Sequence, residues 1–294
     1  MGIFTFRTNC QDIDTGCRGL FYSRRIGRAP RLGGESGDPL STTILGATKI
    51  TGRLGSGLSV GFLNALTQHE VGADGQSIEP QTNYAVARLR QDLNKGQSDI
   101  GLMMTAVNRR LDDVTRSEMS REAYAIGLDG RHRFWSNNYE VAAMLSGSTV
   151  RGEPSAIAAI QTNAAHYYQR PDDEVEYDPT VENLIGDAQR ISMSKFGGGI
   201  TRFQSVLQRY SAGYELNDLG WLQRADELFR RRRVAVVVVD ALGPGDVERG
   251  EAAGLARDRD QQHRSGGGSH APPPGLRSQF PRGMVRRDRR SRDR

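Results

Sequence analysis

The chain has 294 residues, of which 36% are hydrophobic and 35 are glycine, and its formal net charge is +5. No apolar run approaches the roughly 20 residues of a spanning helix, which argues against a helical membrane protein, and the glycine content is high for a compact helical protein. The excess of arginine lies in residues 230–294, so a nucleic-acid surface would depend on that segment alone, and we expect no nucleic-acid partner.

Residues 1–40 read as an irregular and polar N-terminal segment. Its start, from Met1 to Arg7, lacks the basic beginning and apolar core of a signal peptide, so an exported form needs such a segment upstream. Cys10 and Cys17 are the only cysteines, and their spacing allows either a disulfide in an oxidising compartment or two inert thiols.

Residues 41–229 are expected to form one β-barrel-like domain. From about Thr42 to Tyr210 they repeat one pattern, in which a segment with every second residue apolar or small is followed by a turn rich in Gly, Asn, Asp and Pro. This pattern predicts antiparallel β-strands. In the clearest copy, Tyr124, Ile126 and Leu128 share one face, and Asp129 lies on the other. The strands expected are 42–52, 57–67, 82–92, 97–108, 122–134, 137–149, 156–169, 183–196 and 199–211. We expect no long amphipathic helix between them.

The expected connections alternate between short and long for part of the chain. Residues 53–56 and 135–137 suit tight hairpins, whereas 68–81 and 109–121 are long, charged and polar. Aromatic residues fall near the expected strand ends: Tyr84, Tyr124, Phe134, Trp135, Tyr139, Tyr167, Tyr168, Phe196 and Tyr210. Such turns, loops and aromatic rows are typical of outer-membrane β-barrels, although soluble sandwiches also place aromatic residues at strand ends.

Six strings carry a resemblance to a known family. In chain order they are LFYSRRIGRAP from Leu20, ILGATKITGR from Ile44, EPQTNY from Glu79, TAVNR from Thr105, YQRPD from Tyr168 and YELNDLG from Tyr214. They resemble a domain of unknown function in Gram-negative bacteria that follows a family-9 carbohydrate-binding-like module. The resemblance covers about residues 1–229 and implies an outer-membrane β-barrel. The preceding module is absent and more strands are expected after Phe229, so we expect a fragment with an incomplete barrel.

Residues 230–294 change composition abruptly, because they contain a run of arginines, a run of valines, and Gly-rich and Pro-rich stretches. Such a composition cannot bury a core and predicts a disordered, Arg-rich tail. Three interpretations stay open, namely out-of-frame translation, an ordinary disordered tail, and a basic arm that binds nucleic acid or anionic lipid.

Five polar residues are candidates for ligand binding, namely Arg24, Arg25, Arg28, Asn217 and Asp218. The three guanidinium groups could line a lumen and meet carboxylates or sugar hydroxyls. The plainer alternative is that they pair with inward acidic residues such as Asp129 or Glu140. Asn217 and Asp218 suit either a sugar or the cap of a turn.

Gly57, Ser59 and Gly61 match the G-x-S-x-G nucleophile elbow of serine hydrolases. The same residues also alternate as a strand, Asp129 and His132 lie within one strand segment, and nothing supplies an oxyanion-hole loop. The scattered histidines form no metal-ligand pattern. We therefore predict no catalytic residue, no metal ligand and no cofactor.

The leading hypothesis is a non-enzymatic, all-β domain: an antiparallel meander of about nine to ten strands that forms part of an outer-membrane β-barrel. It would come from a surface protein associated with carbohydrate binding or uptake, with outer-membrane lipid and a carbohydrate ligand as its partners. The competing hypothesis is a soluble all-β carbohydrate-active enzyme, a hydrolase, or a binding domain, whose apolar face packs on another sheet.

Overall fold

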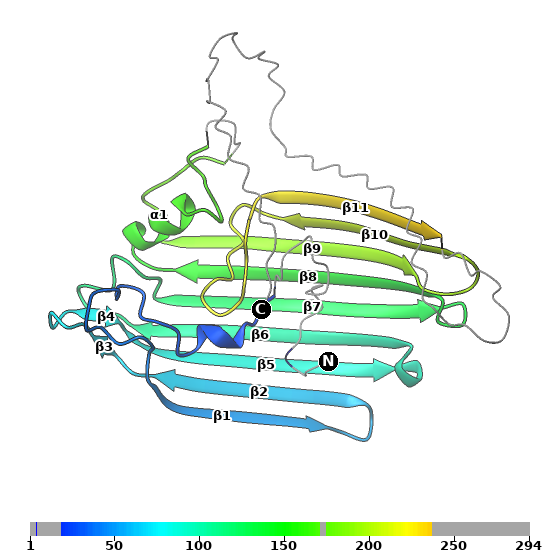
Figure 1. The fold of residues 1–294 in the computed structure, drawn as a ribbon, viewed down its shortest axis with the longest axis horizontal. Helices are drawn as coiled ribbons and strands as arrows, with labels where there is room; N and C mark the ends of the chain where they lie inside the picture. Colours follow the sequence, from blue (N-terminus) through cyan, green and yellow to red (C-terminus); the bar gives the residue numbers. More distant parts are fainter. Residues whose placement is uncertain (1–3, 5–18, 171–174, 237–294) are drawn as a thin grey trace, which may run out of the picture.

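The computed structural model describes residue 4 and residues 19–170 and 175–236. Nine strands form one antiparallel sheet in the order β1-β2-β5-β6-β7-β8-β9-β10-β11, and β3 pairs with β4 beside it (Figure 1). The strands are β1 Ile44–Arg53, β2 Leu58–Thr67, β3 Glu70–Val71, β4 Ser77–Glu79, β5 Gln81–Leu93, β6 Ser98–Arg110, β7 Glu122–Phe134, β8 Tyr139–Arg151, β9 Asn183–Lys195, β10 Thr201–Tyr210 and β11 Glu227–Val236. The predicted all-β meander of nine to ten strands is therefore confirmed.

The sheet does not close on itself within the part of the chain that the structure describes, where β1 and β11 are its edge strands. Cys10 and Cys17, for which a disulfide and two inert thiols both stay open, lie outside the described residues, as does the predicted tail beyond residue 236. No helix among the described residues is long and apolar enough to cross a membrane.

The connections at the two ends of the sheet differ in length, as the sequence predicts. Short turns at 54–57, 94–97, 135–138 and 196–200 lie at one end, and one of them contains the 3-10 helix η2, Asn94–Gly96. The other end carries the long connections 68–80, 111–121, 152–182 and 211–226. In Figure 1 the short turns are on the right, and β3, β4 and α1 are on the left. We call these the turn end and the loop end.

The predicted strand 156–169 is wrong, because the short helix α1, Pro154–Thr162, occupies the first part of this segment. Pro154 occupies the first turn, where its missing N–H is not needed. Alanines 156, 158 and 159 then supply the strongest helix propensity of any residue. The apolar and small residues that suggested a strand instead bury Ala156 and Ile157 against the sheet.

The structure contains a strand, β11, that the sequence did not predict. It pairs with β10 from Tyr210↔Glu227 to Thr201↔Val236, and so it runs through the arginine run at 230–233. The composition of residues 230–294 predicted a tail because it could not bury a core, and charged residues also have a low propensity for strand interiors. The pairing with β10 outweighs this low propensity at the edge of the sheet, where charged side chains are well tolerated.

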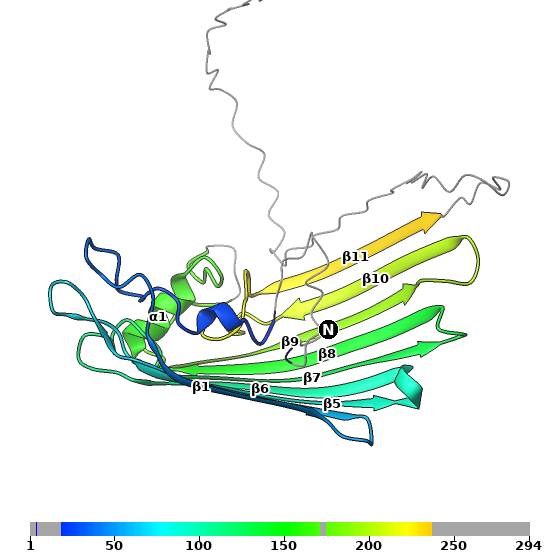
Figure 2. The ribbon, with the colours of Figure 1, turned by 60° about the horizontal axis from the view of Figure 1, so that its bottom comes forward.

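The two faces of the sheet have different surroundings. Figure 2 shows the sheet curved, with the 3-10 helix η1, Ser23–Arg25, and the connection 211–226 on its concave side. The core lies on this side, where inward residues of the strands meet the two segments. Its main members are Leu20, Tyr84, Val86, Met103, Val107, Met144, Tyr210, Tyr214, Leu216, Leu219 and Leu222.

One glycine explains how closely the connection 211–226 can approach the sheet. A Cβ atom at Gly186 on β9 would lie 2.1 Å from the backbone nitrogen of Tyr214. A side chain at this position would therefore push the connection off the sheet. Tyr214 itself is buried, and its hydroxyl lies 2.6 Å from the Ser146 hydroxyl on β8.

Candidate functional site

The convex face of the sheet is apolar and exposed. The alternation of the strands directs the following large apolar side chains outward: Ile50, Phe62, Leu89, Ile100, Met104, Ile126, Leu128, Leu145, Ile185, Ile191, Met193 and Leu207. Each exposes between 38% and 66% of its surface. Exposed apolar side chains gathered on one face are typical of surfaces that contact another protein or a membrane.

Aromatic residues gather where the convex face meets the turn end. Phe134 lies directly opposite Tyr139, with ring centroids 5.6 Å apart, and Trp135 lies within 5.0 Å of both rings. Phe203 of β10 continues the row at 6.2 Å from Tyr139. The predicted aromatic row at strand ends is thus present here, but Tyr84, Tyr168 and Tyr210 instead belong to the buried core on the concave side.

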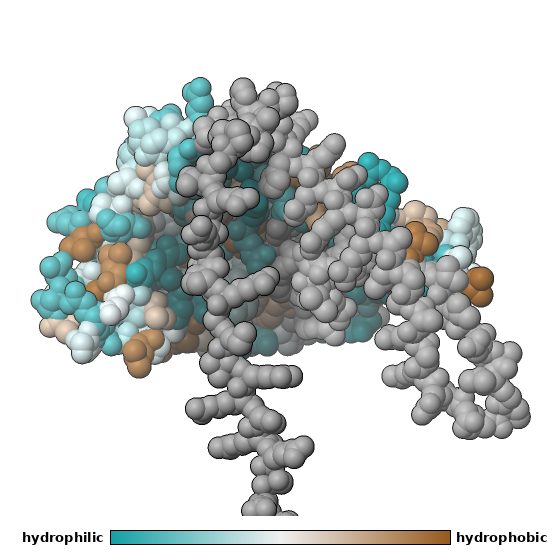
Figure 3. Space-filling model, turned by 45° about the horizontal axis from the view of Figure 1, so that its top comes forward, coloured by the Kyte–Doolittle hydropathy of each residue, from teal (hydrophilic) through white to brown (hydrophobic). Residues whose placement is uncertain are grey.

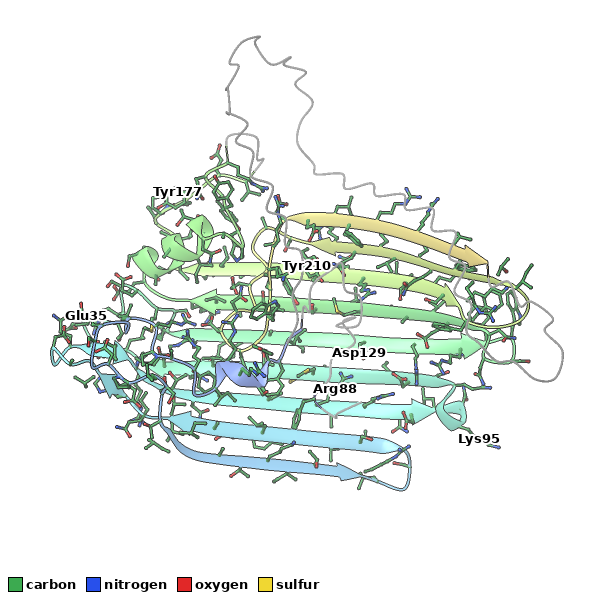
Figure 4. All side chains as sticks on the ribbon, in the orientation of Figure 1. Glu35, Arg88, Lys95, Asp129, Tyr177 and Tyr210 are labelled. Atoms are coloured by element: carbon green, nitrogen blue, oxygen red, sulfur yellow. The ribbon has the colours of Figure 1, made fainter. Side chains whose placement is uncertain are left out.

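The concave face is polar where the core ends. Much of the surface visible in Figure 3 is hydrophilic, and hydrophobic side chains appear at its margins. The centre of this face holds a buried ion pair, in which the Arg88 guanidinium donates to both carboxylate oxygens of Asp129 at 2.5 and 3.0 Å (Figure 4). Both side chains are 1% exposed. Such a pair persists in a buried site because each charge satisfies the other.

A ladder of alternating charges continues from this pair toward the turn end. Asp99 on β6 accepts from Arg90 at 3.0 Å and from Arg131 at 2.6 Å. Glu140 on β8 then lies 3.6 Å from Arg131 and 2.8 Å from Arg133. On the other side, Arg53 of β1 contacts Asp92 of β5 at 2.6 Å. We call these seven residues and the Arg88–Asp129 pair the charge ladder. It runs across the concave face from β1 to β8.

A second cluster fixes the connection 211–226 at the loop end. Asp218 accepts hydrogen bonds from Arg31 at 2.7 Å and from Arg109 at 2.5 Å, and the Ser120 hydroxyl lies beside it. Burial alone would raise the pKa of Asp218, but the two guanidinium groups outweigh it and hold this pKa well below its ordinary value. Asp218 is therefore a fixed negative charge that joins the N-terminal segment, β6 and the connection.

The other candidate binding residues belong to the same cluster or lie beside it. Arg25 donates to the backbone oxygen of Gly220 at 3.0 Å and to the side-chain oxygen of Asn217 at 2.9 Å. Arg28 faces Glu79 at 3.5 Å, and burial together with the nearby Arg31 lowers the pKa of Arg28 to about 10. Arg24 is exposed on η1.

The expected partners of these arginines were wrong, although the type of interaction was right for Arg28. Asp129 pairs with Arg88, and Glu140 pairs with Arg131 and Arg133, and among the described residues neither contacts Arg24, Arg25 or Arg28. Asn217 caps a turn, as one of the two sequence interpretations expected, because its side-chain oxygen also accepts from the Leu222 N–H at 3.0 Å.

The structure does not assemble the hydrolase alternative within the described residues. Ser59 lies in β2, so the G-x-S-x-G segment is a strand rather than a turn that leads into a helix. His132 contacts Ser98 on the neighbouring strand at 2.8 Å, on the opposite face of β7 from Asp129. No group of three potential metal ligands occurs in the part of the chain that the structure describes.

Several residues of the two clusters were not recognised from the sequence. Arg31, Glu79 and Arg109 join Asp218 only through folding, since they lie far apart along the chain. For Arg88 and Gly101, by contrast, the sequence does contain a signal of a buried ion pair. A charged residue at an inward position of a strand needs a partner, and a Cβ atom at Gly101 would lie 2.6 Å from the Arg88 guanidinium.

Comparison with known proteins identifies a family but no curated relative. No curated protein and no solved structure matches the chain. One family model, described as a domain of unknown function, matches residues 16–238, a segment that contains all nine strands of the large sheet. On this match, the chain belongs to the family called Domain of unknown function 5916 (DUF5916).

Proposed function

We propose that the sheet is a membrane-embedded wall of a non-enzymatic β-barrel in the outer membrane of a Gram-negative cell. Its convex face would contact lipid chains, and its concave face would line a polar lumen. The observation that carries this proposal is the reversal of polarity across a single sheet, from the exposed apolar convex face to the concave charge ladder. That order is the opposite of a soluble domain, which keeps its apolar face inside.

The height of the convex band fits a bilayer. On β7, the outward positions from Tyr124 to Phe134 are apolar except for Gly130, which has no side chain, and His132 near the turn end. At a rise of about 3.4 Å per residue and a tilt of about 40°, this length spans roughly 26 Å, close to the ≈ 25 Å band of outer-membrane barrels. The aromatic row formed by Phe134, Trp135, Tyr139 and Phe203 would then lie at the interface on the turn end.

Outward charges support this orientation. On β6 to β8 they lie at the loop end, as Arg110, Glu122 and Arg151. The band is less regular on β9 to β11, where Asp187 and Arg230 also face outward. We therefore place the continuous lipid-facing band on β2 to β8. The long loops would lie on the cell exterior and the short turns in the periplasm, as in known barrels.

The core residues on the concave side give the lumen a plug at the loop end. Leu20, Leu216 and Leu219 pack on the sheet there, and Asp218 ties the plug to β6. The charge ladder stays on the wall nearer the turn end. Rows of carboxylate and guanidinium groups suit hydroxyl-rich ligands, so a carbohydrate-related ligand fits this lumen, in keeping with the module that precedes the resembling family.

The deciding experiment is co-flotation of the full chain with phospholipid vesicles after refolding in detergent. We expect the protein to float with the vesicles, to stay bound after a carbonate wash, and to aggregate when detergent is removed without lipid. A monodisperse, detergent-free protein that does not float would contradict the proposal. It would favour the soluble hydrolase or binding domain, in which another sheet covers the convex face.

A further inference from the structure

Two hollows share a lining residue at the loop end of the sheet. The first is an apolar groove of about 640 Å³ that crosses β2 to β9. The second is a polar pocket of about 650 Å³ at the ends of β6 to β9. Arg151, the last residue of β8, lines both. An apolar groove that leads into a charged pocket has the shape and polarity of a site for an amphiphile.

The groove exists because small outward residues lie between large ones. Its floor contains Ala85 opposite Ala106, with Ala87 and Gly147 further along. Its walls are Phe62, Met104, Tyr124, Ile126 and Ile185. Because the convex face elsewhere carries large side chains, this row of small residues leaves room for an extended hydrocarbon chain.

The pocket is basic. Four arginines line it, Arg109, Arg116, Arg121 and Arg151, against two acidic residues, Glu153 and Glu182. Arg109 is occupied by Asp218, but the other three side chains are between 47% and 66% exposed. Arg116 pairs with Asp113 at 2.9 Å, but the ion pairs of the other two are long: Glu122 lies 3.7 Å from Arg121 and 3.5 Å from Arg151. Such exposed pairs are weak, so the guanidinium groups of Arg121 and Arg151 can leave Glu122 and bind a phosphate instead.

We propose that the groove and the pocket together bind one anionic lipid, with an acyl chain over the alanine floor and the phosphate of its headgroup at Arg121 and Arg151. Arginine holds phosphate with paired N–H donors, which a compact ammonium cannot do. The Tyr124 hydroxyl, bonded to Asn108 at 2.6 Å, marks the boundary between the two parts. This inference rests on the proposed function, because only a lipid-facing convex side meets such a ligand.

The test is native mass spectrometry of the full chain in a neutral detergent, with phosphatidylglycerol as the probe and phosphatidylcholine as the comparison lipid. We expect one phosphatidylglycerol to bind preferentially. R121Q together with R151Q should weaken its binding roughly tenfold, to the level of phosphatidylcholine, because the charge-assisted contacts to the phosphate are lost. The matched control is R209Q, an outward arginine at the end of β10 that lines neither hollow.

The groove is tested separately by A106L, which fills the floor and keeps it apolar. We expect it to abolish the bound phosphatidylglycerol, whereas A143L, at an exposed outward alanine of β8 outside the groove, should leave binding unchanged. Equal binding of both lipids, or equal effects of A106L and A143L, would overturn the inference. Competition by inorganic phosphate alone would also overturn it, because the site would then recognise a free anion.

The same preparations separate this inference from the proposed function. A protein that floats with vesicles of either lipid but shows no preference refutes the lipid site alone. A protein that floats with neither refutes the membrane wall as well.

Discussion

Arg88 on β5 and Asp129 on β7 form a bidentate ion pair that passes over Gly101 on the strand between them. Both charges are buried, so each depends on the other for its stability. The pair also joins three neighbouring strands through side chains, in addition to the backbone ladder. It is the central contact of the charge ladder and the one with the largest expected effect on stability.

Removing one member of this pair should destabilise the protein strongly. For D129N or R88M we expect the free energy of unfolding to fall by about 3–5 kcal/mol, because the two charge-assisted hydrogen bonds of this buried pair are broken. Urea unfolding in phospholipid vesicles measures this loss. The double variant R88M/D129L should recover part of it. A double variant as unstable as the sum of the two single variants would show that the two charges do not act as a pair.

Gly101 is expected to be intolerant of a side chain. In G101V the new Cβ would lie 2.6–2.8 Å from the Arg88 guanidinium, which cannot move away without leaving Asp129. We therefore expect a loss of stability similar to that of D129N. The matched control is G147A, whose Cβ would lie 3.7 Å from the nearest atom, an ordinary contact. Urea unfolding should show less than about 0.5 kcal/mol of change for G147A.

Asp218 should hold the connection 211–226 in place over a wide pH range. Its pKa is lowered in the fold, so its stabilising contribution is complete above the ordinary value of 3.8 and is lost only as the pH falls below that value. The protection of the backbone amides in 211–226 against hydrogen exchange should thus stay high between pH 8 and 5. D218N should exchange faster across this range, because Arg31 and Arg109 lose their shared anion.

The control for this prediction is D187N, which removes an exposed ion pair with Arg209 beside the same connection. Exposed pairs contribute about 0–1 kcal/mol, so its exchange should stay close to wild type. Equal acceleration in D187N and D218N would show that the connection responds to any lost charge and not to the buried cluster.

The strands could be predicted wherever apolar or small residues occupy every second position. Glu122–Phe134 was predicted to the residue, because Ile126 and Leu128 alternate with Ala125 and Gly127 without interruption. The pattern failed at α1, where alanine and isoleucine suit a helix and a strand equally. It failed again at β11, whose arginines become acceptable only because β10 offers a partner.

The candidate site was predictable only in part. A local string contains Asn217 and Asp218, and a second contains Arg25 and Arg28, so the sequence could nominate them. Their partners come from other strands and loops, and a sequence pattern carries no information on such distant pairings. Gly101 is the exception, since a glycine at an inward strand position signals that another group occupies its space.

If the convex face contacts lipid, the cost of introducing a charge there should depend on how deep the position lies in the bilayer. Leu128 is 49% exposed at the middle of β7, so L128R would place a charge at the centre of the bilayer. We expect the free energy of unfolding in vesicles to fall by about 2–4 kcal/mol. Asn108 faces outward near the loop end of β6, and N108R should cost only about 0–1 kcal/mol, because the guanidinium reaches the interface.

Urea unfolding in vesicles measures both variants, and their difference is the informative quantity. If another protein sheet covers the convex face, the loss of stability at both positions would depend on side-chain packing and not on depth in a bilayer. L128R would then also abolish the association of the two sheets in detergent-free buffer. Equal costs for L128R and N108R would therefore contradict a lipid environment. A cost that grows toward the middle of the strand supports it, since a soluble surface has no such gradient.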